Sequence, residues 1–148
     1  MAYLDTNKYL DAVCRMIEEG STNVPVPVRG DSMIPFLRSG DFVFLSPLPQ
    51  EVRPGDIILF QRPDGHYVLH RIYKKHPDGY FIMLGDGQLT QEPALRDSFR
   101  AIALGARCGG QHCAPGSFRW WFFYWPWRVF APWRRQIADL LALFRKKK

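Results

Sequence analysis

The sequence predicts a small, mainly β domain with an amphipathic helix before it and an aromatic, basic segment after it. Short runs between residues 24 and 104 are rich in β-forming residues, and Gly, Pro and Asp turn signals separate them. Such runs favour a curled, antiparallel sheet. A chain of 148 residues suits one compact domain with appendages, and 47% hydrophobic residues exclude disorder throughout.

The first element expected is a helix over residues 5–19, within an N-terminal segment 1–22. Asp and Thr open it as capping residues, and Gly20 ends the pattern. Spacings of three and four residues place one apolar face on Leu10, Val13, Cys14 and Ile17.

A β domain over residues 23–107 follows. Its expected strands are 24–28, 42–45, 57–61, 66–73, 80–84 and 99–104. The run "GGQHCAPG" then predicts a linker over 108–117, because Gly and Pro interrupt regular structure.

Residues 118–148 form the aromatic, basic segment. All five tryptophans lie in 118–133, and a helical face of Ile137, Leu140, Leu141 and Phe144 comes after them. Aromatic and cationic residues together suit an anionic membrane surface, whereas the interspersed Pro and Arg argue against a transmembrane helix. A tail folded against the body, or docked on a partner protein, is the alternative.

Charge is divided unevenly along the chain. The C-terminal segment holds eight Lys and Arg against one acidic residue, while residues 1–117 hold 12 basic and 13 acidic residues. The basic character therefore belongs to the tail, and no nucleic-acid partner is expected.

The cysteines Cys14, Cys108 and Cys113 are odd in number, and no secretory signal precedes them. We expect a reducing compartment and a cytoplasmic protein, or one peripheral on the inner face of a membrane. The run "CGGQHC" lacks the ligand number of a zinc site, so no metal and no cofactor are expected.

The stretch "RGDSMIPFLRSGDFVFL" at 29–45 opens a series of motifs that continues with "PGDIILFQ", "YVLHRI" and "LGDG". In order and spacing, these motifs resemble signal peptidase I and the wider serine-peptidase group that includes LexA-type repressors. The resemblance covers roughly residues 26–106 and implies the small, curled antiparallel fold of that group. It also implies a serine endopeptidase.

The resemblance makes Ser32 the nucleophile and His70 its general base, since a serine hydroxyl needs a base within hydrogen-bond reach. Bacterial signal peptidases use a lysine at the position of His70. The chain is therefore most similar to the Ser-His variant of the endoplasmic reticulum and of spore formers. Imidazole titrates near 6.5 unaided, which predicts an apparent pKa of about 6 to 7 for kcat/KM.

A carboxylate that orients the base completes the expected site. Asp86 in "LGDG" is the first candidate and Glu92 the second, because the family places a further acidic residue about six positions on. Taken alone, each of these residues is more often a turn or core residue. Their order along the chain favours catalysis by Ser32, His70 and Asp86.

The remaining implied roles concern substrate and support. The backbone N–H of Ser32 is the expected oxyanion donor, and Gly30 lacks the hydroxyl with which many signal peptidases provide a second one. Met33 and Pro35 are the expected substrate-binding residues, which implies cleavage of an extended peptide or precursor after Ala, Gly or Ser. Asp41, Asp56 and Arg71 match the motifs as turn-closing or supporting residues.

Two other functions stay open. A noncatalytic peptide-binding or membrane-associated adaptor is compatible with the same fold. A LexA-like self-cleaving regulator is less favoured, because no Ala-Gly or Cys-Gly site precedes Ser32.

Overall fold

The computed structural model describes residues 2–146, with side chains from residue 6 onward except that of residue 138. Eight strands form one antiparallel sheet, so the predicted mainly β class is confirmed. The strands are β1 (Val24–Pro27), β2 (Phe42–Ser46), β3 (Ile57–Gln61), β4 (Tyr67–Lys75), β5 (Phe81–Leu84), β6 (Glu92–Ala94), β7 (Phe99–Cys108) and β8 (Gln111–Cys113).

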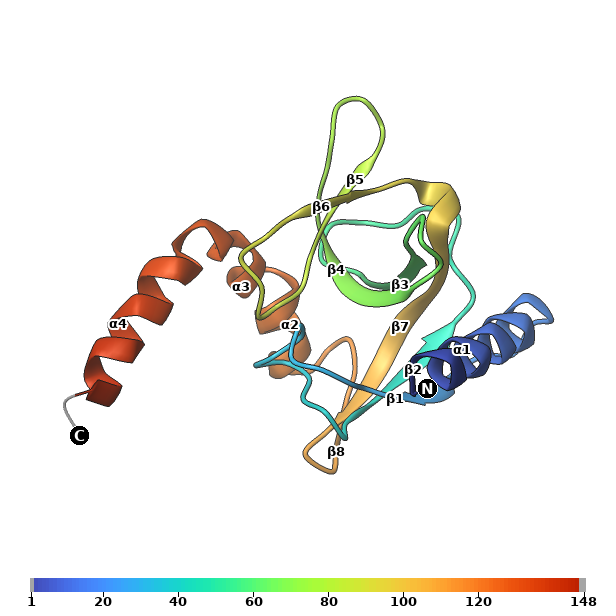
Figure 1. Cartoon of the computed structure of the whole chain (residues 1–148), viewed down its shortest axis with the longest axis horizontal. Helices are drawn as coiled ribbons and strands as arrows, with labels where there is room; N and C mark the ends of the chain where they lie inside the picture. The colour runs from blue at the N-terminus through green and yellow to red at the C-terminus, as the bar shows by residue number, and fades with distance from the viewer. Residues whose placement is uncertain (1, 147–148) are drawn as a thin grey trace.

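The order of the sheet is β1-β2-β7-β3-β4-β5-β6, with β8 paired to β7. Strand β7 is the longest and pairs with β2 along one part and with β3 along another. Register shifts between Phe44 and Leu45, and between Leu59 and Phe60, bend the sheet at these pairings. The sheet therefore curls around its own apolar interior (Figure 1).

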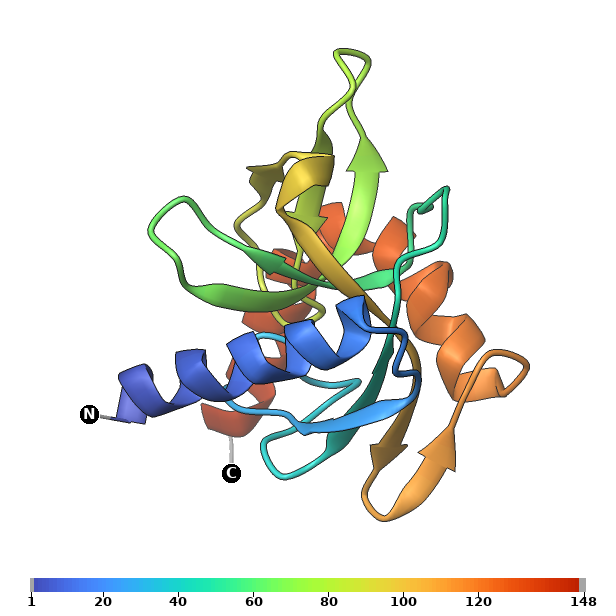
Figure 2. The same cartoon turned by 90° about the vertical axis from the view of Figure 1, so that its right-hand side faces the viewer.

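Helix α1 (Ala2–Glu18) lies against the curled sheet beside β1, below the turn that joins β3 to β4 (Figure 2). The expected apolar face of the helix is buried in the main core. Two polar contacts join the helix to the β3–β4 hairpin: Asn7 donates to the Gly65 carbonyl, and the Tyr67 hydroxyl donates to Asp11 at 2.5 Å. These contacts fix the helix as one wall of the domain.

Two tight turns are closed by aspartate side chains, as their residue composition predicts. Asp41 accepts a hydrogen bond from the Arg38 N–H at 2.9 Å, and Asp56 accepts one from the Arg53 N–H at 2.8 Å. Both carboxylates thus close their turns, as the sequence indicated.

The range expected as a linker contains a strand. β8 turns back on β7 through Gly109 and Gly110, and Cys113 is buried against the core. Three residues are too few to show an alternating pattern, so neither β8 nor the equally short β6 is visible in the sequence.

Four helical pieces follow: α2 (Phe118–Tyr124), α3 (Pro126–Val129), η2 (Ala131–Trp133) and α4 (Arg134–Lys146). Trp120 and Phe123 of α2 are buried against Phe36, with ring centroids 5.7 and 5.0 Å from it. Residues 118–134 therefore fold onto the body, whereas α4 projects away from it (Figure 1). Within the described part of the chain, no helix has the length and apolarity to cross a membrane.

Candidate active site

Ser32 lies on the loop that connects β1 to β2. Below it, Met33, Phe36 and Leu37 are almost completely buried and anchor the loop to the core. Hydrogen bonds within the loop give it its shape. They run from the Ile34 N–H to the Asp31 carbonyl and from the Leu37 N–H to the Met33 carbonyl. The serine itself stays half-buried at the surface of this anchored loop.

The "LGDG" turn after β5 supports the Ser32 loop from behind. The Gly87 N–H donates to the Ser32 carbonyl at 2.9 Å. A Cβ on Gly85 would collide with the same carbonyl, and one on Gly87 would lie 2.5 Å from the Ile34 carbonyl. Glycine is required at both positions because two stretches of backbone pass in direct contact.

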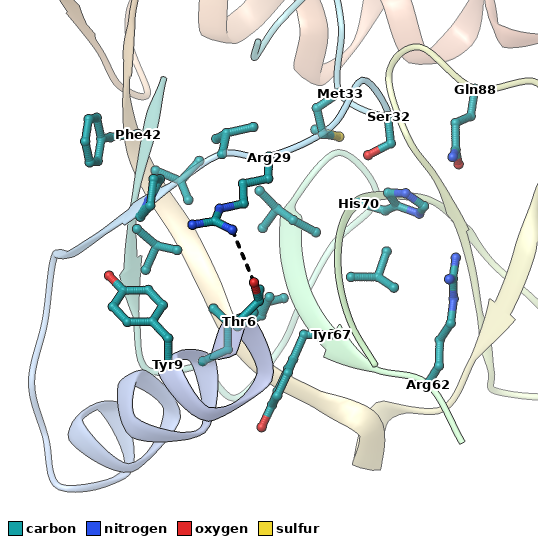
Figure 3. Close-up of a pocket in the computed structure, with 18 residues that line it drawn as sticks. Thr6, Tyr9, Arg29, Ser32, Met33, Phe42, Arg62, Tyr67, His70 and Gln88 are labelled. Carbon is teal, nitrogen blue, oxygen red and sulfur yellow. Dashed lines mark hydrogen bonds between the residues drawn. The ribbon is translucent and has the colours of Figure 1, made fainter. Parts of the chain in front are cut away.

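His70 comes from β4, and its side chain is only 2% exposed. Ser32 and His70 line one open groove of about 930 Å³, whose other walls include Leu10 of α1 and Val26 of β1. In Figure 3 the Ser32 hydroxyl points toward the imidazole ring. The structure thus brings together the two residues that the sequence pairs as nucleophile and base.

Asp86, the first candidate for orienting the base, pairs with Arg71. Its two carboxylate oxygens accept from Nε and Nη2 of Arg71, each at 2.8 Å, and both side chains are buried. Arg71 also donates to the Gly55 carbonyl at 2.7 Å. The contacts of Asp86 are those of a structural ion pair between β4 and the turn after β5.

Glu92, the second candidate, lies beside the base. Its Oε1 is 3.3 Å from Nδ1 of His70, close enough for electrostatic attraction but without the alignment of a hydrogen bond. Arg62 holds the Glu92 carboxylate through two hydrogen bonds of 2.7 and 3.0 Å. The base therefore faces a carboxylate that a second side chain keeps in place.

Burial lowers the pKa of His70 to about 4, because a desolvated imidazolium is disfavoured; the nearby Glu92 opposes this shift. The value lies below the 6 to 7 expected from an unperturbed imidazole. His70 is therefore neutral at neutral pH, which is the state that a general base requires.

The C-terminal segment braces the same loops, as the alternative of a tail folded against the body allowed, but through contacts that the sequence did not indicate. The Trp127 indole donates to the Asp86 carbonyl at 2.8 Å, and Arg134 donates to the carbonyls of Gly85 and Gln88. Arg119 donates to two carbonyls of the Ser32 loop, at Pro35 and Phe36. Side chains that bond to backbone carbonyls leave no pairing signal in the sequence.

The two residues expected to bind substrate are placed differently. Met33 lines the groove, whereas Pro35 is not among its described lining residues and turns its carbonyl to Arg119. Among the described residues, no cluster of three or more His, Cys, Asp or Glu side chains could hold a metal ion.

Residues 1–94 match the family described as Peptidase S24-like, and this range is more than half of the chain. The protein therefore belongs to the Peptidase S24-like family. The matched range contains Ser32, His70, Asp86 and Glu92, and ends before β7. This confirms the broader resemblance to the group of LexA-type repressors and signal peptidases, while the Ser-His variant rests on the residues alone. No curated protein and no solved structure matches the chain.

Gly85→Ala is expected to lower the free energy of unfolding by about 1–3 kcal/mol, because the added methyl group forces the Ser32 loop away. Gly105→Ala is the matched control, since its Cβ would meet the Phe44 ring at an ordinary 3.5 Å. Urea unfolding of both variants measures the difference. Equal stability of the two would contradict the close contact between the loops.

Asp86→Asn is expected to destabilise the fold by about 3–5 kcal/mol, because it leaves the buried charge of Arg71 without its partner. The exposed Asp31→Asn should stay within about 0.5 kcal/mol of the wild type. Denaturant titration checks both. A loss of turnover in Asp86→Asn at unchanged stability would instead make Asp86 part of the chemistry.

Proposed function

We propose that the protein is a serine endopeptidase that cuts an extended peptide through an acyl-enzyme on Ser32, with His70 as general base. The observation that carries this proposal is the shared groove, in which the Ser32 hydroxyl points toward a buried imidazole (Figure 3). The hypothesis of a noncatalytic adaptor explains less, since it gives no role to the imidazole of His70 beside Ser32.

In the first step the Ser32 oxygen attacks the scissile carbonyl carbon while His70 takes the hydroxyl proton. Because Nδ1 faces Glu92, Nε2 is the nitrogen left for this transfer. The tetrahedral intermediate collapses when the peptide C–N bond breaks, and the imidazolium returns its proton to the leaving amine. Water then attacks the acyl-enzyme while His70 takes a proton from it. The ester C–O bond to Ser32 breaks, His70 returns the proton to the Ser32 oxygen, and the acid product leaves.

Glu92 is the residue proposed to position the base. Its carboxylate attracts the imidazolium that forms during attack, and its position 3.3 Å from Nδ1 favours this orientation of the ring. The pairing with Arg62 restrains Glu92, whose side chain is 24% exposed. We assign this role to Glu92 in preference to Asp86, whose carboxylate is occupied by Arg71.

The negative charge of the intermediate needs a donor close to Ser32. The Ser32 backbone N–H makes no hydrogen bond to any of the described residues, so it is free to bind an oxyanion. The Ser32 carbonyl, by contrast, is held by Gly87, and this bond fixes the peptide plane that follows the nucleophile.

The substrate is proposed to pair with β4 beside the base. β3 covers one side of β4 from Tyr67 to Arg71, but among the described residues β5 joins the other side only from Arg71 onward. The stretch 67–70 therefore lines the groove with one edge open, where an extended peptide can add as a strand. The outer edge of β1 is a poorer site, because Pro25 and Pro27 have no N–H to donate.

Met33, in the wall of the groove next to the nucleophile, is proposed to limit the space for the residue before the scissile bond. Under this proposal the residue before the scissile bond is Ala, Gly or Ser.

Incubation of a diverse peptide library with the full chain, followed by mass spectrometry, tests the proposal. Cuts after small residues are expected in the wild type, and Ser32→Ala should reduce them by at least about a thousandfold, since the nucleophile is gone. Ser39→Ala, in an exposed part of the same loop, should cleave like the wild type. Identical cleavage by all three proteins would overturn the proposal, and specific binding without cleavage would favour the adaptor.

The pH profile tests the base. Since protonated His70 is inactive and its pKa is lowered to about 4, kcat/KM should rise with pH around that value and be level by pH 6.5. Glu92→Gln should lower kcat by at least about tenfold and move the acidic limb to lower pH, because the lost carboxylate favoured the charged form. Asp64→Asn, a carboxylate paired with His66, is the matched control and should change neither. An acidic limb unmoved in Glu92→Gln would remove Glu92 from the site.

A further inference from the structure

The outer side of the C-terminal helices carries the largest group of exposed apolar side chains described in the molecule. On α2, α3, η2 and the residues between them these side chains are aromatic or branched, and on α4 all but Leu143 form a stripe at helical spacing. They are Phe118, Trp121, Trp125, Val129, Phe130, Trp133, Ile137, Leu140, Leu141, Leu143 and Phe144.

Helix α4 receives almost no support from the rest of the domain. Every described side chain from Arg135 to Lys146 is exposed, and the helix projects from the body (Figure 1). An isolated helix of 13 residues is marginal in water, and its stability normally comes from covering its apolar face. The stripe on α4 thus requires an occupant outside the described fold.

Basic residues surround this apolar surface. Arg135 lies at the start of α4, with Arg145 and Lys146 in its last turn, and Asp139 is the one acidic residue of the segment. Lys147 and Lys148 continue the basic run in the sequence but lie outside the described residues. The occupant must accept apolar side chains and carry negative charge.

We propose that the outer face of residues 118–146 binds the surface of an anionic membrane, with α4 lying in the plane of the lipid headgroups. Tryptophan side chains favour this interfacial depth, and basic residues near the surface are attracted by anionic lipids. The inner face of the same segment stays on the body, where Trp120 and Phe123 are buried. Docking therefore needs no unfolding, and it does not depend on the chemistry of Ser32.

Other occupants fit less well. A second copy would bring two strongly basic surfaces together, because eight Lys and Arg of residues 118–148 face one acidic residue. Nucleic acid would satisfy the charge and could stack on the aromatic rings, but it would leave the aliphatic side chains Ile137, Leu140 and Leu141 of α4 without an apolar cover.

Flotation of the full chain with vesicles measures the binding directly. Vesicles of equal parts phosphatidylcholine and phosphatidylglycerol should bind at least about tenfold more strongly than vesicles of phosphatidylcholine alone, and salt should weaken the binding. Equal binding to both vesicle types would overturn the electrostatic part of the proposal. Absence of binding to either would overturn the whole.

Paired substitutions assign the binding to α4. Leu140→Gln with Phe144→Gln should weaken vesicle binding by about tenfold or more, whereas Leu95→Gln with Leu104→Gln on the β domain should leave it unchanged. Circular dichroism and thermal unfolding verify that each variant keeps its fold.

Charge is tested in the same way. Arg145→Gln with Lys146→Gln should cost roughly tenfold in binding to the anionic vesicles, and Lys74→Gln with Lys75→Gln on β4 should cost little. Equal losses in the two pairs would mean general charge attraction and contradict a defined surface. Vesicle-independent dimers, or a DNA fragment bound through the same residues, would likewise overturn it.

Discussion

The buried ion pair between Arg71 and Asp86 is the interaction on which the candidate site depends. It joins β4, which carries His70, to the turn that supports the backbone of Ser32. Removing two charges from water is costly, so such a pair is tolerable only when its remaining hydrogen-bonding groups are satisfied. Here the Gly55 carbonyl takes a further N–H of Arg71, and the Trp127 indole binds the Asp86 carbonyl. Ser32 and His70 are thus held by one connected network.

The two acidic residues show how environment divides similar side chains between structure and chemistry. Asp86 is completely buried and engaged on both oxygens by a guanidinium, which makes it part of the framework. Glu92 is partly exposed and shared between Arg62 and His70, so its charge acts directly on the imidazole ring. A desolvated imidazole beside a restrained carboxylate is neutral at rest and stabilised once protonated, which suits a general base.

The C-terminal segment has two faces with different roles. Its inner face, through Arg119, Trp127 and Arg134, binds backbone carbonyls of the loops that carry and support Ser32. Its outer face leaves aromatic and aliphatic side chains uncovered beside basic residues. This segment lies beyond residue 94, where the family match ends, as do β7 and β8. Because the same stretch of chain forms both faces, any contact of the outer face lies close to the side chains that support the Ser32 loop.

The sequence by itself determined the β class, six of the eight described strands and the N-terminal helix, because alternation and turn residues are local patterns. The order of the motifs also indicated that Ser32 and His70, which line one groove, belong together. The sequence also indicated that Asp41 and Asp56 close turns. Only the tertiary structure decided that Arg71 pairs with Asp86 and that Glu92 lies beside His70, since both contacts depend on which strands become neighbours. It also showed that "GGQHCAPG" contains the strand β8 and that residues 118–134 pack on the body. Burial removes Arg71 and Asp86 from water, so that each needs the other as a partner, and it lowers the pKa of His70. Burial is a property of the folded chain rather than of any short stretch.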